Sequence, residues 1–174
     1  MTKINNIYEA VDDFGLISSA EALDLGMSNA EMVQHANRGN LVRVARGVYR
    51  MPIWPSHMQD PYAIALKSVG KDACLYAETV IAMLNLAPTD PNKIWIACPR
   101  RVRKNLGSGI YVIKRTDIVP VLISGLYCQP LYQAIISSVK TLGHFRASQA
   151  AQAAISQGLL SAKEKAYVKK ELKV

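Results

Sequence analysis

The segment Asn40–Arg50, NLVRVARGVYR, alternates apolar and basic residues on both sides of an Arg-Gly pair. Val and Tyr are strand formers, and glycine supplies the positive φ that a tight hairpin turn requires. We therefore expect two short strands, near 41–44 and 48–51, joined by a turn at 45–47. The segment predicts a β-hairpin that is unusually rich in arginine.

Alternation assigns the two kinds of side chain of this hairpin to opposite faces. The residues expected to face the neighbouring helices are Val42, Val44 and Val48. The arginines are expected in solvent: Arg43 on the outer face, Arg46 at the tip and Arg50 near the end of the hairpin. Such a hairpin can straddle a phosphate ridge or enter a minor groove of DNA. The alternative is a solvated surface without a partner.

Two helix starts precede the hairpin at short spacing. Ser18 with Glu21, and Ser28 with Glu31, form two Ser-x-x-Glu capping boxes, and glycines follow both helices. A first helix fits roughly residues 3–13, where apolar residues recur at helical spacing. Three helices followed by a two-stranded hairpin are typical of a winged helix-turn-helix.

The helix that follows Ser28 has an apolar stripe and a polar face. We expect the stripe, Ala30, Met32, Val33 and Ala36, to pack inward, and Glu31, Gln34, His35 and Arg38 to share the opposite face. Arginine pairs with guanine, and Asn or Gln with adenine, in the major groove, while a helix N-terminus can hold a phosphate. The predicted DNA-contacting residues are Ser28, Asn29, Gln34, His35, Arg38, Arg43, Arg46 and Arg50.

Charge is unevenly distributed along the 174 residues, whose net charge is +8. Residues 1–31 carry one lysine and six acidic residues, whereas residues 32–50 carry four arginines and no acid. After residue 60, 16 basic residues accompany 6 acidic ones. A basic protein favours phosphate-bearing partners, although a lysine surplus also serves solubility.

Residues 51–61, MPIWPSHMQDP, hold three prolines, which is typical of a semi-rigid linker. We place a winged-helix domain at 1–52, a linker at 53–61 and a second domain at 62–174. The second domain is expected to be α+β, with a small sheet and a helical tail. Its helices are predicted near 62–70, 77–86, 130–141, 147–157 and 161–172, and its strands near 93–98, 109–115 and 118–123.

The densest basic run of the second domain is PRRVRKN, residues 99–105, between two predicted strands. Its cations are Arg100, Arg101, Arg103 and Lys104. They are candidates for contact with a nucleic acid or an acidic partner protein. A solvated loop remains the alternative for this run.

Signals for catalysis and for metals are poor. No paired carboxylates, P-loop or HExxH motif is present, so we expect no enzyme, no catalytic residue and no cofactor. Cys74, Cys98 and Cys128 are widely spaced and lack a CxxC pair, so we expect reduced thiols and no metal. The amino terminus has no apolar signal region, and the longest apolar stretch, IVPVLISGLY, is too short to cross a bilayer. We expect a cytoplasmic protein without a membrane partner.

Residues 15–51 resemble the amino-terminal winged helix of the AbiEi antitoxins of type IV, or abortive-infection, toxin–antitoxin systems. The most specific phrase is GNLVRVARGVY, which resembles that family's GxLxRVxRGVY-like ending. A looser similarity covers 62–174, through AETVIAMLNL, KIWIA, GIYVIKR and ISQGLLSAKE. Many members of the family are longer than this chain.

The resemblance implies an antitoxin with two tasks. Its winged helix would bind inverted repeats in the promoter of its own operon and repress it. The sequence itself leaves open whether the chain binds DNA as a monomer or a dimer. Its second domain would counteract a nucleotidyltransferase-like toxin, without a stable complex between the two. The alternative functions are a general winged-helix regulator, or an interaction protein whose basic second domain binds RNA or an acidic protein.

Overall fold

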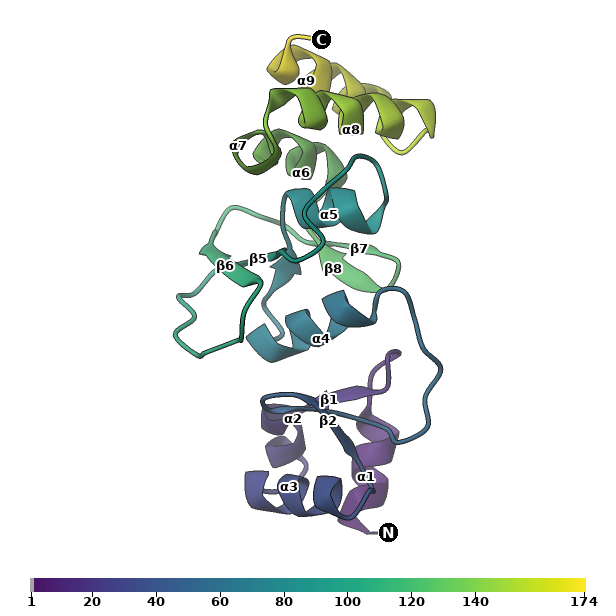
Figure 1. The fold of residues 1–174 in the computed structure, drawn as a ribbon, viewed down its shortest axis with the longest axis vertical. Helices are drawn as coiled ribbons and strands as arrows, with labels where there is room; N and C mark the ends of the chain where they lie inside the picture. Colours follow the sequence, from purple (N-terminus) through teal and green to yellow (C-terminus); the bar gives the residue numbers. More distant parts are fainter. Residues whose placement is uncertain (1) are drawn as a thin grey trace. The chain divides into compact units, whose positions relative to one another are not determined.

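The computed structural model describes residues 2–174, and the chain divides into two compact units, one ending at Lys71 and the other spanning Asp72–Val174 (Figure 1). The fold class is α+β, as expected, with one sheet in each unit. The elements of the first unit are α1 (Lys3–Ala10), β1 (Leu16–Ser18), α2 (Ser19–Asp24), α3 (Asn29–Asn37), β2 (Val42–Ala45), β3 (Val48–Arg50) and α4 (Asp60–Val69).

Both expected capping boxes are present at the starts of α2 and α3. The hydroxyls of Ser18 and Ser28 accept hydrogen bonds from the backbone N–H of Glu21 and Glu31. The two glutamates accept in return from the serine N–H groups, at 2.8 Å and 2.7 Å. These reciprocal bonds satisfy backbone donors that a helix start leaves free, so both helices begin where the sequence predicts.

The first helix is shorter than the predicted span of 3–13, because α1 ends at Ala10. The Asp12 carboxylate accepts hydrogen bonds from the N–H groups of Phe14 and Leu16, at 2.9 Å and 3.0 Å. This turn leads directly into β1, a strand that the sequence analysis missed. Three residues between a turn and a capping box are too few to show alternation.

The three-stranded sheet has the order β1-β3-β2, with both pairs antiparallel. It confirms the expected hairpin of β2 and β3, with Arg46 and Gly47 in the turn. Cross-strand partners share a face of a sheet, so the pairing of Ile17 and Arg43 with Tyr49 places these three on one face. Val42 and Leu16 both pair with Arg50, on the other face.

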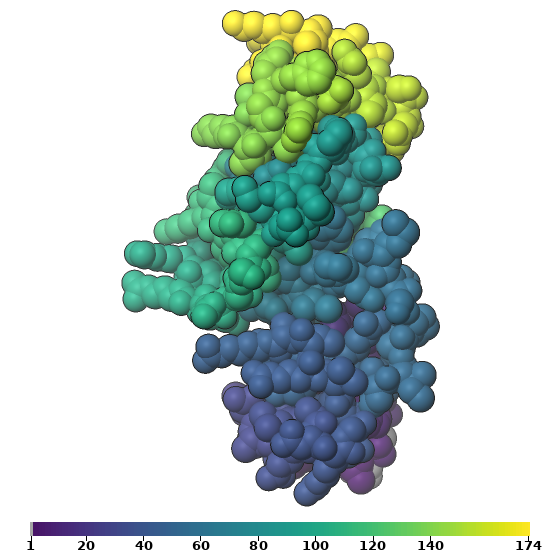
Figure 2. All heavy atoms as spheres, in the orientation of Figure 1, coloured from purple at the N-terminus to yellow at the C-terminus, as the bar shows by residue number. Residues whose placement is uncertain are grey.

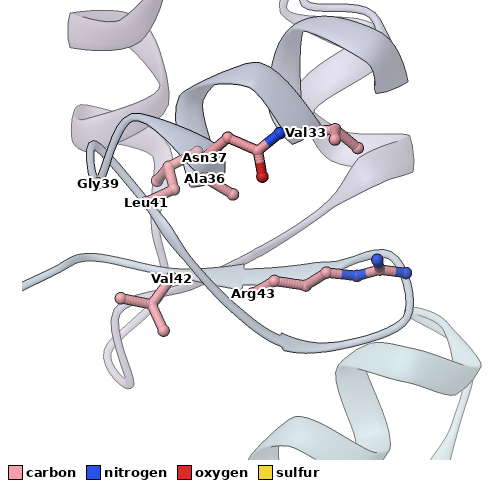
Figure 3. Close-up of a pocket in the computed structure, with 7 residues that line it drawn as sticks. All are labelled: Val33, Ala36, Asn37, Gly39, Leu41, Val42 and Arg43. Carbon is pink, nitrogen blue, oxygen red and sulfur yellow. The ribbon is translucent and has the colours of Figure 1, made fainter.

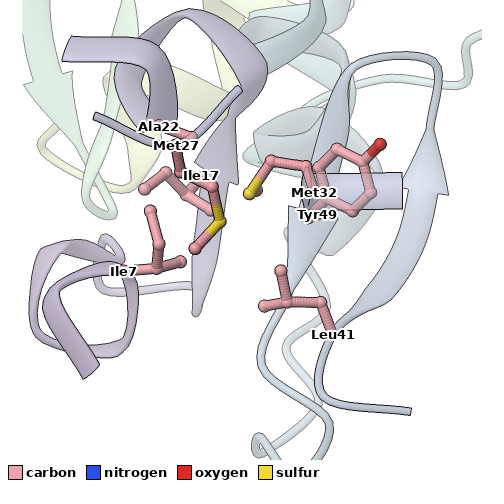
Figure 4. Close-up of a cluster of buried hydrophobic side chains, with 7 residues drawn as sticks. All are labelled: Ile7, Ile17, Ala22, Met27, Met32, Leu41 and Tyr49. Carbon is pink, nitrogen blue, oxygen red and sulfur yellow. The ribbon is translucent and has the colours of Figure 1, made fainter. Parts of the chain in front are cut away.

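Both faces of this sheet are covered. On one face, buried side chains from α1, α2, α3 and the strands form a single cluster (Figure 4), which comprises Ile7, Ile17, Ala22, Met27, Met32, Leu41 and Tyr49. Leu16 and Val48 are buried on the other face, and α4 lies on that side (Figure 1). Burial of each large apolar side chain stabilises the fold by about 1.5–3 kcal/mol.

Helix α4 belongs to the first unit, whereas the sequence predicted a second domain that begins at residue 62. Its Lys67 reaches between two carboxylates, with its Nζ 3.0 Å from Asp12 and 3.2 Å from Glu21. Burial raises the pKa of Glu21, but hydrogen bonds from Ser18 and the charge of Lys67 outweigh it and lower that pKa. The division between the units therefore follows α4, and the proline-rich segment lies inside the first unit.

The second unit is built on a mixed five-stranded sheet of order β6-β5-β4-β8-β7. Its strands are β4 (Cys74–Leu75), β5 (Ile94–Cys98), β6 (Ile110–Lys114), β7 (Val121–Ile123) and β8 (Leu126–Cys128). β5 and β6 confirm two predicted strands, whereas β4 and β8 were missed because they have only two and three residues. The sheet is larger than expected, since β8 pairs with β4 and carries β7 at its edge.

Helices pack in layers beside this sheet (Figure 1). They are α5 (Glu78–Met83), α6 (Leu131–Ser137), α7 (Val139–Leu142), α8 (His144–Ser156) and α9 (Ala162–Leu172). The predicted helix 130–141 is divided between α6 and α7, and the Ser138 hydroxyl there donates to the carbonyl of Ile135. A third capping box, of Ser161 with Glu164, begins α9 as expected.

The three cysteines are free thiols buried in the second unit. Burial raises the pKa of Cys74 to about 11 and that of Cys128 to about 12. Both groups are therefore protonated at neutral pH, which makes them poor nucleophiles. No helix within residues 2–174 is long and apolar enough to cross a membrane.

Gly15 provides a test of the first unit. Its φ is +71°, and a Cβ at this position would lie 2.5 Å from the ring of Trp54. We expect Gly15→Ala to lower the free energy of unfolding by about 2–4 kcal/mol, because backbone strain and overpacking add. Urea unfolding followed by circular dichroism measures this loss.

Gly26→Ala is the matched control, since Gly26 also has positive φ but no atom within 4 Å of a Cβ. Its expected loss is about 1 kcal/mol, from backbone strain alone. Equal losses for the two variants would contradict the close contact between Gly15 and Trp54.

Candidate nucleic-acid interface

The solvent-exposed face of α3 differs from the predicted one. Met32 is the buried residue of the helix, and Ala36, one turn later, packs against the core. Val33 is 38% exposed and Ala30 is also exposed, so the prediction that both pack inward is wrong. The core contacts only a narrow side of this nine-residue helix. Its exposed residues are Asn29, Ala30, Val33, Gln34 and Asn37, followed by Arg38.

Glu31 and His35 lie at the half-buried edges of α3 and have partners. The His35 Nδ1 lies 3.1 Å from the amide nitrogen of Asn40, and the Glu31 carboxylate lies 2.8 Å from the Nζ of Lys3. Hydrogen bonds from Lys3 and Ser28 lower the pKa of Glu31 to about 2. The carboxylate is therefore ionised at neutral pH, and its charge is offset by a neighbouring lysine.

The start of α3 holds two of the predicted contact residues. The Ser28 hydroxyl is engaged in the capping box. The side-chain oxygen of Asn29 accepts a hydrogen bond from the Ser19 hydroxyl, at 3.3 Å. Both residues therefore organise the junction between α2 and α3, and exposed Asn29 also presents its amide to solvent.

The first strand of the hairpin departs from the predicted phase, whereas Val48 on β3 is buried as predicted. Leu41 is buried in the core, and Val42, which was expected to face inward, is 45% exposed. Arg43 pairs with Tyr49 and so points to the side of the sheet that α3 covers, not away from it. β2 is an edge strand with an irregularity between Arg43 and Ala45, so the arginine remains in solvent at the rim.

Arg50 has a structural role and is largely shielded from solvent, contrary to the prediction. Its Nη1 lies 3.2 Å from Asp60 on α4, and its Nη2 donates to the carbonyl of Pro55 at 3.0 Å. The side chain is only 17% exposed. Arg50 therefore joins the hairpin to α4 and is not available to a ligand in this arrangement.

The other three arginines of residues 32–50 are available. Arg38, Arg43 and Arg46 are exposed, and none has an ion pair or side-chain hydrogen bond with any residue that the structure describes. Arg38 follows the last turn of α3, Arg43 lies on β2 and Arg46 in the hairpin turn. The part of the chain that carries these arginines is drawn in dark blue in the space-filling view (Figure 2).

A groove of about 370 Å³ lies between the second half of α3 and β2 (Figure 3). Its lining residues are Val33, Ala36, Asn37, Gly39, Leu41, Val42 and Arg43. None of them is acidic. The groove thus joins the exposed face of α3 to the basic hairpin, and it combines apolar side chains with an amide and a guanidinium.

Val33, Asn37 and Val42 are exposed residues of the groove that the sequence did not predict as contact residues. Residues 30, 33, 34 and 37 also share one face of a helix, so periodicity permitted this assignment. The apolar character of Ala30, Met32, Val33 and Ala36 favoured the other assignment, in which all four pack inward. The distinguishing signal is the size of Met32, which with Ala36 fills the narrow contact with the core.

The basic loop of the second unit, residues 99–105, connects β5 and β6. Arg100 forms a two-point ion pair with Asp72, through Nε at 2.9 Å and Nη2 at 3.1 Å. Arg101, Arg103 and Lys104 are exposed. Arg100 therefore anchors the loop to the start of the unit, and the other three cations form its solvent-facing surface.

Residues 2–174 contain no group of three side chains suited to hold a metal ion. The sequence matches no protein-family model, and no curated protein matches it either.

The two hairpin arginines Arg50 and Arg46 are expected to behave differently on substitution. Arg50→Ala leaves the half-buried Asp60 without its cation, and we expect it to lower the free energy of unfolding by about 1–3 kcal/mol. Arg46→Ala removes an exposed side chain without a partner and should change it by less than about 0.5 kcal/mol. Thermal unfolding measures both. Equal stability of the two variants would show that the Arg50–Asp60 pair does not hold α4.

Proposed function

We propose that the first unit is a winged helix-turn-helix that binds duplex DNA. In this proposal α2 and α3 form the helix-turn-helix, α3 enters the major groove, and the β2–β3 hairpin is the wing. The observation that supports it best is the set of three unpaired arginines, Arg38, Arg43 and Arg46, on α3's end and the hairpin, of which Arg43 lines a groove that borders the exposed face of α3.

Charge favours a polyanion as the occupant of this surface. A free guanidinium is a bidentate donor suited to phosphate, and its binding to DNA releases condensed counterions. Part of the acidic charge of the unit is offset by lysines. Asp12 and Glu21 neutralise Lys67, and Glu31 pairs with Lys3. Three of the six acidic residues of 1–31 are thus paired with lysines, whereas Arg38, Arg43 and Arg46 form no ion pair among the described residues.

The biological role that we propose is that of a type IV antitoxin of the AbiEi kind, which represses its own operon. The proposal rests on the resemblance of residues 15–51 and 62–174 to that family. Its target would be inverted repeats in the promoter, bound by one or two copies of the chain. Its second unit would counteract a nucleotidyltransferase-like toxin without a stable complex.

The second unit offers an alternative function. The exposed cations Arg101, Arg103 and Lys104 suit RNA or an acidic protein. This candidate has weaker support than the wing, because Arg100 is already paired with Asp72. It remains the competing explanation if the first unit fails to bind DNA.

The salt dependence of binding tests the DNA-binding proposal. Alanine at Arg38, Arg43 or Arg46 should weaken binding to promoter DNA and reduce the slope of log K against log salt by about 0.9 for each phosphate that the protein no longer neutralises. Fluorescence anisotropy with a labelled promoter duplex, titrated at several salt concentrations, measures both quantities.

The control is the double variant Arg101→Ala with Arg103→Ala, which removes two exposed charges from the other unit. It should retain the promoter affinity and slope of the unaltered protein. Weaker binding by this double variant, with unchanged binding by the three wing and α3 variants, would assign DNA binding to the loop at 99–105 and overturn the proposal.

The antitoxin role has a separate test in cells. Co-expression with the nucleotidyltransferase-like product of a neighbouring reading frame should restore growth that the toxin alone stops. The Arg46→Ala variant should still restore growth, because neutralisation is assigned to the second unit, while repression of a promoter reporter should fall. Growth arrest despite normal expression of the unaltered protein would contradict the antitoxin role.

A further inference from the structure

We infer that α3 reads A·T base pairs and that Val33 determines this preference by contacting the methyl group of thymine. The inference rests on the proposed DNA binding by the first unit and specifies its target. It concerns which bases α3 selects, whereas the arginines account for affinity to the phosphate backbone.

The exposed face of α3 places an apolar group between amides. Asn29, Val33 and Asn37 are four residues apart and form one stripe, and Ala30 and Gln34 form the adjacent stripe. Val33 is 38% exposed and lies outside the buried cluster of the core. In Figure 3 it projects from α3 near Asn37, at the groove. A helix inserted by this face would present valine and amides together to the base edges.

This combination of groups matches an A·T pair better than a G·C pair. In the major groove adenine offers the N6 donor and N7 acceptor that an Asn or Gln amide pairs with, and thymine offers its methyl group to apolar side chains. Guanine is read most often by arginine or lysine. On α3 no cation precedes Arg38, which follows the helix, so the helix itself lacks a guanine reader.

Charge opposes a second copy of the chain as the occupant of the same surface. A twofold contact through the groove would bring Arg43, which lines it, close to its own copy, and like charges in contact are unfavourable. No lining residue is acidic, so the groove offers Arg43 no counter-charge. A DNA duplex provides the negative charge that this surface lacks, and its thymine methyl groups can contact the exposed apolar side chains of the surface.

Replacement of thymine by deoxyuridine tests the inference, because it removes only the methyl group. The full-length protein first selects duplexes from a randomised 20-base-pair library. The enriched duplex is then compared with the same duplex carrying deoxyuridine for thymine. We expect an A·T-rich core, and a loss of affinity of about fourfold for each methyl contact, the effect of burying one methyl group.

The variant Val33→Ala should bind thymine and deoxyuridine duplexes with nearly equal affinity. Leu23→Ala is the matched control, because Leu23 is a 63% exposed apolar residue on α2, outside the groove. It should keep the full difference between the two duplexes. Unfolding midpoints of both variants should equal that of the unaltered protein, since both side chains are exposed.

The outcomes separate the inference from the proposal beneath it. No enrichment, together with no salt-dependent binding to any duplex, would overturn DNA binding itself. Enrichment of a G·C core, or equal affinity for thymine and deoxyuridine, would overturn the reading by Val33 while DNA binding stands. If Val33→Ala keeps the affinity difference between the thymine and deoxyuridine duplexes, another residue contacts the methyl group. That result would also overturn the inference.

Discussion

The pairing register of β2 with β3 decides which arginines of the hairpin can meet a ligand. The side chains of a strand alternate between faces, so a shift of one residue would exchange the two sets. As the strands pair, Arg50 lies on the α4 side and is held by Asp60, while Arg43 lies on the α3 side beside Val33 and Asn37. The same register buries Tyr49 and Leu41 in the core. The stability of the unit and the exposure of its arginines therefore both depend on the backbone hydrogen bonds between β2 and β3.

The charged residues on the two faces of the first sheet have different roles. On the α4 side, ion pairs of Arg50 with Asp60, and of Lys67 with Asp12 and Glu21, are partly buried and connect elements distant in sequence. On the α3 side the arginines lack partners. Partly buried pairs restrict geometry, whereas unpaired surface cations retain their full charge for a partner. Net charge alone would not distinguish these two groups.

Much of the first unit was predictable from local signals, because short sequence motifs determine capping boxes and glycine turns. Both Ser-x-x-Glu boxes and the Arg46-Gly47 turn are where the sequence predicts them. The sequence did not predict which residues of β2 face the core. Valine at position 42 suggests an inward residue, and the bulge before Ala45 has no sequence signature. The roles of Arg50 and Val33 depend on contacts across the fold, with Asp60 and Met32 respectively. Strands of two or three residues, such as β1, β4 and β8, are likewise stabilised by long-range pairing.

The most direct test of the account maps the DNA contact onto the chain. Isotopically labelled full-length protein is titrated with a promoter duplex, and chemical-shift changes are recorded by NMR for backbone amides and arginine side chains. Binding of DNA by α3 and the wing predicts changes that cluster on the exposed face of α3, on Arg43 and on Arg46, and that leave the Arg50 guanidinium unaltered. Changes confined to residues 99–105, or spread evenly over the basic residues, would contradict it.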